Sequence, residues 1–163
     1  MPASIRPLTA PDLDAVVAFA VRAWAPVFDS MRGVLGEVIY RQLYPDWRAM
    51  QERAVEQGCR AATETWVADV DGRPVGFAAV VHHDESSDEP CSGEIEMVAV
   101  DPEHQRQGVG AQLIAHALEG MRRAGLRLAV VATGGDPGHA PARAAYEKAG
   151  FTGLPLVRYY QAL

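Results

Sequence analysis

Apolar residues recur along the chain with two different periods, and the changes between them predict an alternation of strands and helices. The segment from Ser4 to Leu8 is short and contains Pro7, as expected of an edge strand. Apolar positions then follow at helical spacing up to Trp24, and Thr9 is suited to the N-cap of that helix. Pro26 is expected to end it, since proline removes a helical hydrogen bond.

A second helical region is expected from about residue 34 to residue 57. It is interrupted near Tyr44-Pro45, and Gly58 is the expected cap. Large aromatic residues are concentrated between residues 24 and 47. Most of these rings are expected in the core, and the remainder are available to line a pocket.

The middle of the chain reads as a hairpin followed by a third strand. Asp71-Gly72 separates the strand Trp66–Val70 from a returning strand over residues 73–81. An acidic loop over residues 82–93 comes next, and a short apolar-rich strand from Glu94 ends at Asp101-Pro102.

The last third of the chain alternates helix and strand. Helical spacing continues from Val109 to Met121, a strand is expected over Leu126–Ala132, and a helix begins near Pro141. Phe151 then enters a terminal pair of strands, of which residues 157–161 form the last.

Composition and charge narrow the class of protein. A chain of 163 residues with 48% hydrophobic and 22% charged residues suits one soluble globular domain spanning 1–163. Its net charge of -6 argues against general nucleic-acid binding, and its apolar runs are too short to cross a bilayer. The N-terminus lacks the apolar region of a signal peptide, so a cytoplasmic location is expected. Cys59 and Cys91 form no CxxC pair, which favours free thiols and no metal knuckle.

The most informative stretch is Gln105-Arg106-Gln107-Gly108-Val109-Gly110, between a strand and a helix. A helix start leaves about four N–H groups without partners, and glycines let an anion approach them closely. The stretch therefore predicts a pyrophosphate site, although it matches neither the GxGxxG nor the GxxxxGK[ST] pattern. Taken alone, these six residues also fit an ordinary glycine-containing helix start.

This stretch and a second motif together resemble the GCN5-related N-acetyltransferases (GNAT). The first motif is an Ala-Val strand end, Asp-Pro and QRQGVG, and the second is ARAAYEKAGF at residues 142–151. The resemblance implies an α/β (α+β) fold: a mixed, mostly antiparallel twisted sheet flanked by about four helices and splayed between its fourth and fifth strands. It also implies acetyl-CoA as cosubstrate.

The coenzyme contacts that the resemblance implies lie on the strand end, the glycine loop and the final helix. They are expected at Val98, Ala99, Val100, Gln105, Arg106, Gln107, Gly108, Val109, Gly110, Ala111, His139 and Arg143. Members of the family commonly carry asparagine seven positions before the tyrosine of the second motif, where this chain has His139. Histidine can still donate a hydrogen bond to the coenzyme.

Acyl transfer to an amine needs a base for the ammonium proton, and a proton donor for the leaving thiolate is favourable. Glu94 and Glu96 lie two apart on one strand and face the same side. Glu94 falls at the position of the base in histone-modifying members, and Glu96 is the second candidate. Tyr146 matches the family's thiolate-protonating tyrosine. The residues alone equally allow two solvent-facing carboxylates and an aromatic side chain covering the sheet.

Two functions follow as alternatives. The first is an acetyl-CoA-dependent N-acetyltransferase acting on a primary amine of a small molecule or peptide, by direct transfer in a ternary complex. The second is a non-catalytic acyl-CoA-binding sensor on the same scaffold. We expect no metal, nucleic acid or membrane partner. The identity of the amine and the oligomeric state stay open, a homodimer being one of the possibilities.

Overall fold

The computed structural model describes residues 3–163, so Met1 and Pro2 of the N-terminal stretch considered above lie outside the described residues. Five strands form one sheet in the order β1-β2-β3-β4-β5, antiparallel except for the parallel pair β4–β5. The elements are β1 (Ser4–Pro7), η1 (Ala10–Asp12), α1 (Leu13–Leu43), α2 (Trp47–Ala61), β2 (Glu64–Val70), β3 (Arg73–His82), β4 (Ser92–Val100), η2 (Pro102–His104), α3 (Val109–Arg123), β5 (Leu128–Val131), η3 (Pro137–His139) and α4 (Ala140–Lys148).

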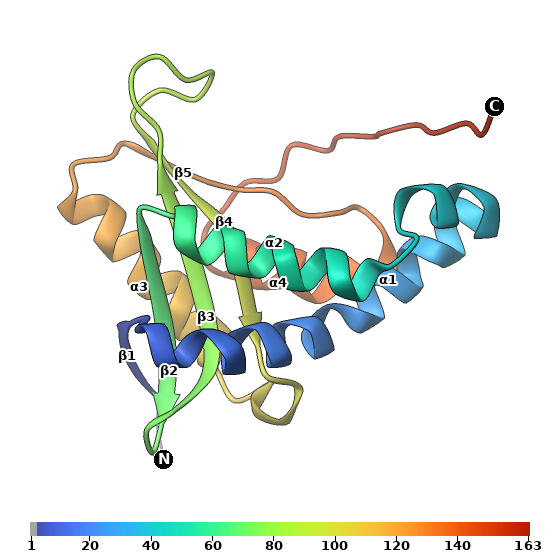
Figure 1. The fold of residues 1–163 in the computed structure, drawn as a ribbon. Coiled ribbons are helices and arrows are strands. Elements are labelled where there is room, and N and C mark those ends of the chain that lie inside the picture. The colour runs from blue at the N-terminus through green and yellow to red at the C-terminus, as the bar shows by residue number, and fades with distance from the viewer. Residues whose placement is uncertain (1–2) are drawn as a thin grey trace.

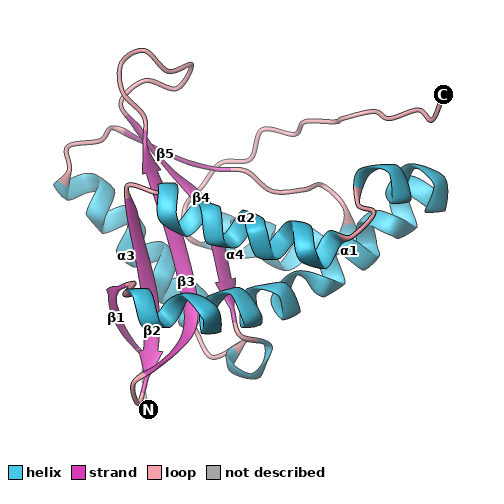
Figure 2. Ribbon diagram, viewed as in Figure 1, coloured by secondary structure: helices cyan, strands magenta, loops and turns pink. Residues whose placement is uncertain are grey.

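The helices cover both faces of the sheet (Figures 1 and 2). α1 and α2 lie on one face, where Phe19 and Val55 pack against Phe77. α3 lies on the other face, where Ile114 packs against Ile95. A β-strand sends alternate side chains to opposite faces, so each strand contributes to two cores.

The predicted hairpin is confirmed. Asp71 and Gly72 have φ values of 51° and 80°, as a two-residue turn with both central residues in the left-handed region requires. The predicted edge strand is also confirmed, because within residues 3–163 β1 pairs only with β2.

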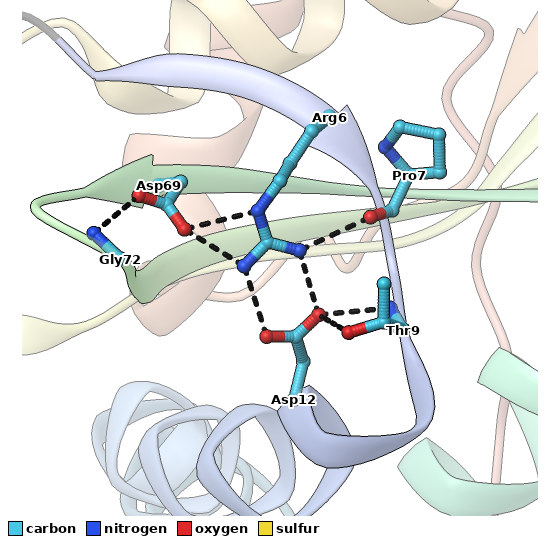
Figure 3. A network of polar contacts seen from close by, with 6 residues as sticks. All are labelled: Arg6, Pro7, Thr9, Asp12, Asp69 and Gly72. Carbon is cyan, nitrogen blue, oxygen red and sulfur yellow. Dashed lines mark hydrogen bonds and ion pairs between the residues drawn. The ribbon is translucent and has the colours of Figure 1, made fainter.

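A charged network fixes β1 and the start of α1 to the edge of the sheet (Figure 3). The Arg6 guanidinium donates to both Asp12 oxygens at 2.7 and 2.9 Å, and to Asp69 of β2 at 2.7 and 3.0 Å. Asp12 also accepts from the backbone N–H and hydroxyl of Thr9 at 2.8 and 2.7 Å. Hydrogen bonds from Arg6 hold the pKa of the Asp12 carboxyl well below its usual range.

Two predictions about the helices were wrong. Pro26 does not end the first helix, because Phe28 beyond it stacks on Trp47 of α2 at 4.5 Å between ring centroids and keeps the segment packed. The irregular position is Gly36, with φ 76° and ψ 162°. Gly58 is no cap but lies inside α2, where an added Cβ would come within 2.9 Å of Met97.

No helix in residues 3–163 is both long and apolar enough to span a membrane.

The predicted pair of terminal strands was also wrong. Residues 152–163 form no strand and no helix. They run outward past α1 and α2 and leave β5 as the last strand of the sheet (Figure 1). Propensity favoured strands here, but strand formation also needs a partner edge in reach.

Candidate active site

The predicted splay is present between β4 and β5. Their parallel pairing begins at Ser92 and Leu128 and ends at Ile95 and Val131, whereas β4 continues to Val100. Beyond Ile95, β5 diverges from β4. Every second residue among the last five of β4 therefore directs its backbone N–H and C=O toward the side on which β5 no longer pairs with it. An extended ligand can pair with those groups as a neighbouring strand would.

Three residues predicted to contact the coenzyme, Val98, Ala99 and Val100, form this open end of β4. Their side chains are directed to both cores: Ala99 packs with the α1–α2 side and the two valines with the α3 side. The open side of the strand therefore presents backbone groups. A β-bulge lies just before these residues, at Glu96, where the register of β4 against β3 shifts between Ala79 and Val80.

The glycine loop leads from the open end of β4 to the start of α3. Gly108 is the N-cap of α3 with φ 84°, and no side chain caps this helix end. An added Cβ at Gly108 would meet nothing within 4 Å, and one at Gly110 would meet only Val100, at 3.6 Å. The space in front of the first N–H groups is thus open, as binding of a bulky anion requires.

The remaining residues of this predicted set have different surroundings. The Gln105 and Gln107 amides donate to the backbone oxygens of Val100 at 3.1 Å and Glu103 at 3.3 Å, which shapes the loop. Arg106 is exposed with φ 59°. Ala111 is exposed in the first turn of α3, whereas the side chain of Val109 is buried in the core.

Glu94 and Glu96 lie on the sheet face that α1 and α2 cover, as predicted for two residues on one side of a strand. Ile95 between them packs against α3 on the opposite face. The Glu96 carboxylate lies beside Gly58 of α2. Met97 follows it on the same face because of the bulge.

His83 is a polar neighbour of Glu94 that sequence reasoning did not assign. Its Nε2 lies 2.8 Å from the Glu94 carboxylate, and both side chains are about one quarter exposed, at 26% and 29%. Ligand atoms of Glu89 lie within 4.8 Å of both groups. The loop between β3 and β4 brings the three residues together. Their spacing in the sequence does not predict this contact, because the contact depends on the path that the loop takes.

Tyr146 of α4 packs on the α3 side with Val131, where β5 ends. Its ring lies 6.0 Å from that of Phe151, in an edge-to-face arrangement. Burial raises the pKa of Tyr146 above its ordinary value. The phenol is therefore protonated at neutral pH, the form that can donate a proton.

His139 ends the connector between β5 and α4, and Arg143 lies in α4; both bind protein groups. His139 Nδ1 pairs with the Asp136 carboxylate, and Arg143 donates to the backbone oxygens of Gly134 at 2.5 Å and Asp136 at 2.8 Å. Burial raises the pKa of Asp136, but hydrogen bonds from Ser30 and His139 outweigh it, so the pKa is lowered overall.

Ser30 of α1 is a second residue that the sequence did not reveal. Its hydroxyl donates to Asp136 at 2.6 Å and accepts from the backbone N–H of Gly138 at 2.8 Å. These contacts tie α1 to the connector that follows β5, although more than 100 residues separate them. Charged and polar groups of the connector are thereby fixed near the splay.

Comparison with known proteins agrees with this architecture. The sequence profile of the Acetyltransferase (GNAT) family matches residues 34–151. A search of curated proteins gave no match.

Several solved structures share the fold across nearly the whole chain. The aminoglycoside acetyltransferase AAC(6')-Iy, bound to a bisubstrate analogue, is 21% identical with a TM-score of 0.66, over 100% of this chain and 99% of that one. The ribosomal-protein-S18-alanine N-acetyltransferase of Escherichia coli is 21% identical with a TM-score of 0.66, over 94% and 79%. The PaiA N-acetyltransferase of Thermoplasma acidophilum, bound to coenzyme A, is 16% identical with a TM-score of 0.69, over 93% and 91%.

Proposed function

The chain belongs to the acetyltransferase (GNAT) family, and on that premise we propose that it transfers the acetyl group of acetyl-CoA directly to a primary amine. The observation that supports this most is the junction of two features: the splayed end of β4 and the uncapped, glycine-flanked start of α3. A nucleotide diphosphate joined to an extended amide-containing arm matches both at once. Solved relatives that contain coenzyme A or a CoA-derived analogue have this fold.

In this proposal the donor lies along the path from α3 to the splay. The N–H groups at the start of α3 bind the pyrophosphate, where the helix dipole also favours negative charge. The backbone of Val98–Val100 pairs with the pantetheine arm, which brings the thioester to the bulge at Glu96. Backbone N–H groups of β4 are the candidates for stabilising the thioester oxygen as it gains negative charge.

The transfer itself requires proton movements at both the nitrogen and the sulfur. The amine must first lose a proton, and Glu94 paired with His83, or alternatively Glu96, takes it directly or through water. The neutral nitrogen attacks the thioester carbon and becomes positively charged in the tetrahedral intermediate. As the C–S bond breaks, the thiolate of coenzyme A takes a proton from Tyr146. The nitrogen then loses its second proton, which restores the Tyr146 phenol directly or through water. Direct attack needs no acyl-enzyme, so both substrates are bound together in a ternary complex.

The acceptor reaches the reaction from the α1–α2 face, on which Glu94 and Glu96 lie. The loop between β3 and β4 adds Glu89 beside Glu94, and the same loop carries the exposed Asp84 and Glu85. We infer from this concentration of carboxylates that the acceptor carries more positive charge than one ammonium. Structural relatives act on aminoglycosides and on a ribosomal protein, so a small molecule and a peptide are both retained as acceptor classes.

The proposal is tested by mixing the protein with acetyl-CoA and a panel of polyamines, aminoglycosides and peptides, and following the release of free thiol. We expect saturable thiol release with at least one polycationic amine, and mass spectrometry should show the acetylated product. Glu94→Gln should reduce the rate by a factor on the order of 10² or more. Tight acetyl-CoA binding without thiol release from any acceptor would support the sensor instead.

A further inference from the structure

Three side chains that can bind a metal ion converge where the loop between β3 and β4 leaves the end of the sheet (Figure 1). His83 directly follows β3, Glu89 lies in the loop, and Glu94 lies in β4. One ligand atom from each residue lies within 4.8 Å of the other two. Among residues 3–163, no other group of three histidine, cysteine, aspartate or glutamate side chains converges this closely. The cluster therefore differs from the other carboxylates of the same loop.

Ser92 fixes the backbone on both sides of this cluster. The residue is 0% exposed, and its hydroxyl donates to the backbone oxygen of Glu89 at 2.7 Å. The backbone oxygen of Ser92 in turn accepts the N–H of His83 at 2.9 Å. Glu94 lies two residues further along, where β4 pairs with both β3 and β5. All three side chains are thus attached to backbone that is already ordered, which lowers the entropic cost of binding a ligand between them.

The donor atoms of the cluster suit a first-row divalent cation such as zinc. Zinc binds imidazole nitrogen and carboxylate oxygen, and with three protein ligands it keeps a fourth position for water. Calcium and magnesium prefer oxygen ligands alone, so the imidazole of His83 disfavours both of them. The two carboxylates supply the charge that balances a divalent ion.

The distances in the cluster are close to those that zinc requires. Ligand atoms bound tetrahedrally at about 2.0–2.2 Å are about 3.3–3.6 Å apart. His83 Nε2 lies 2.8 Å from the Glu94 oxygen, so these two atoms must separate by about half an ångström. Glu89 is exposed, and its side chain can approach by rotation. The metal replaces the His83–Glu94 hydrogen bond, so the imidazole keeps its proton on Nδ1 and offers the Nε2 lone pair.

We propose that His83, Glu89 and Glu94 bind one divalent cation of the zinc type, and that the bound ion inhibits acetyl transfer. The site itself depends only on the geometry of the loop, whereas its effect on catalysis rests on the proposed function. In that function Glu94, paired with His83, accepts a proton from the amine. A metal ion that occupies the lone pairs of both groups removes this base, and its charge repels the ammonium group of the acceptor.

Binding is tested with the full chain and no acetyl-CoA, by titration with zinc in a buffer that fixes the free metal concentration. Calorimetry should show one zinc ion per chain. In long-range ¹H–¹⁵N NMR spectra the Nε2 signal of His83 should shift, while the signals of the other histidines stay unchanged. His83→Gln and Glu89→Gln should each weaken binding at least tenfold. Their circular dichroism should match that of the unaltered chain, because Glu89 is exposed and His83 is partly exposed.

Two matched controls change neighbouring groups that lie outside the cluster. Glu85→Gln removes an exposed carboxylate of the same loop, and Cys91→Ser removes the partly exposed thiol near its end. Both variants should keep the zinc affinity of the unaltered chain. Zinc binding that survives His83→Gln and Glu89→Gln would overturn the site, and so would equal losses in the two controls. A lack of saturable binding at micromolar free zinc would overturn it as well.

The effect on catalysis is measured with an acceptor identified by thiol release. Mass spectrometry of the acetylated amine then replaces the thiol assay, because zinc also binds free thiols. Zinc should compete with the amine and not with acetyl-CoA, and its inhibition constant should match its dissociation constant. In Glu89→Gln this constant should rise at least tenfold, measured against the metal-free rate of the same variant.

Failure of this inference and failure of the proposed function give different results. Full activity with zinc bound would overturn the inhibition and favour Glu96 as the base, while the chain would still be an acetyltransferase. If no amine is acetylated, the proposed function is wrong, whereas calorimetry and the His83 signal still decide whether the metal site exists.

Discussion

Replacing Asp12 by Asn tests whether the charged network at the sheet edge holds the N-terminal segment in place (Figure 3). The Asp12 side chain is only 8% exposed, and it accepts four hydrogen bonds: two from Arg6 and two from Thr9. The amide has nearly the same shape but no charge, and its NH₂ group must face donors on Arg6 or Thr9.

The expected loss follows from these contacts. A hydrogen bond to a charged group contributes about 1.5–3 kcal/mol, and removal of one partner from a buried ion pair costs about 3–5 kcal/mol. Arg6 keeps its contacts with Asp69 and is 32% exposed, so solvent compensates part of the loss. We expect Asp12→Asn to lower the free energy of unfolding by about 2–3 kcal/mol at pH 7.

Urea denaturation followed by circular dichroism measures this difference, and Asp14→Asn is the control because Asp14 is exposed near the start of α1. The control should change stability by less than about 0.5 kcal/mol. A loss for Asp12→Asn as small as that of the control would refute the importance of the network.

The pH dependence of the same difference gives a second check. The folded-state pKa of Asp12 is lowered by Arg6, so its stabilisation is complete above the unfolded pKa of about 3.9 and is lost as pH falls toward the folded value. The advantage over Asp12→Asn should therefore be constant from pH 7 to about pH 5 and shrink only in stronger acid. A decline between pH 7 and pH 5 would contradict this cause.

Three further predictions concern the candidate site and the thiols. Gly110→Ala should weaken acetyl-CoA binding severalfold in calorimetry, because the new methyl group lies in front of the helix start. Thermal stability should be kept, since this methyl group meets only Val100, at an ordinary 3.6 Å. Unchanged affinity would show that the pyrophosphate binds elsewhere. Tyr146→Phe should lower kcat at least tenfold with little change in the affinity for acetyl-CoA, since the missing proton matters only as the thiolate leaves. An unaltered kcat in steady-state kinetics would remove this phenol from the mechanism. Burial raises the pKa of Cys59 to about 11. At pH 8 Ellman's reagent should therefore modify the partly exposed Cys91 first and reach Cys59 only on unfolding. Equal rates of modification of the two thiols would contradict the burial of Cys59.

Local patterns were enough to predict the parts of the site that adjoin one another in the chain. The glycine loop, the helix that follows and the turn at Asp71-Gly72 depend on backbone conformations within a few residues, which glycine and proline spacing specifies. The common face of Glu94 and Glu96 follows from the period of a strand. Even the splay was expected, through the resemblance of two motifs to a family.

Local sequence patterns do not predict contacts between distant segments. The pairs His83–Glu94 and Ser30–Asp136 form because loops and a long helix cross at particular points, and no local preference encodes the crossing. Gly58 was taken as a helix cap because glycine often ends helices, but it is there to let α2 approach Met97.

Interactions among neighbouring residues thus specify the five strands of the sheet, the start of α3 and the open N–H groups beside its glycines, and these were predictable from the sequence. Contacts made on folding specify that a helix continues through Pro26, that His83 pairs with Glu94, and that residues 152–163 stay unpaired within one chain. Those outcomes depend on which surfaces meet after folding, and packing free energy can exceed the preference of any single segment.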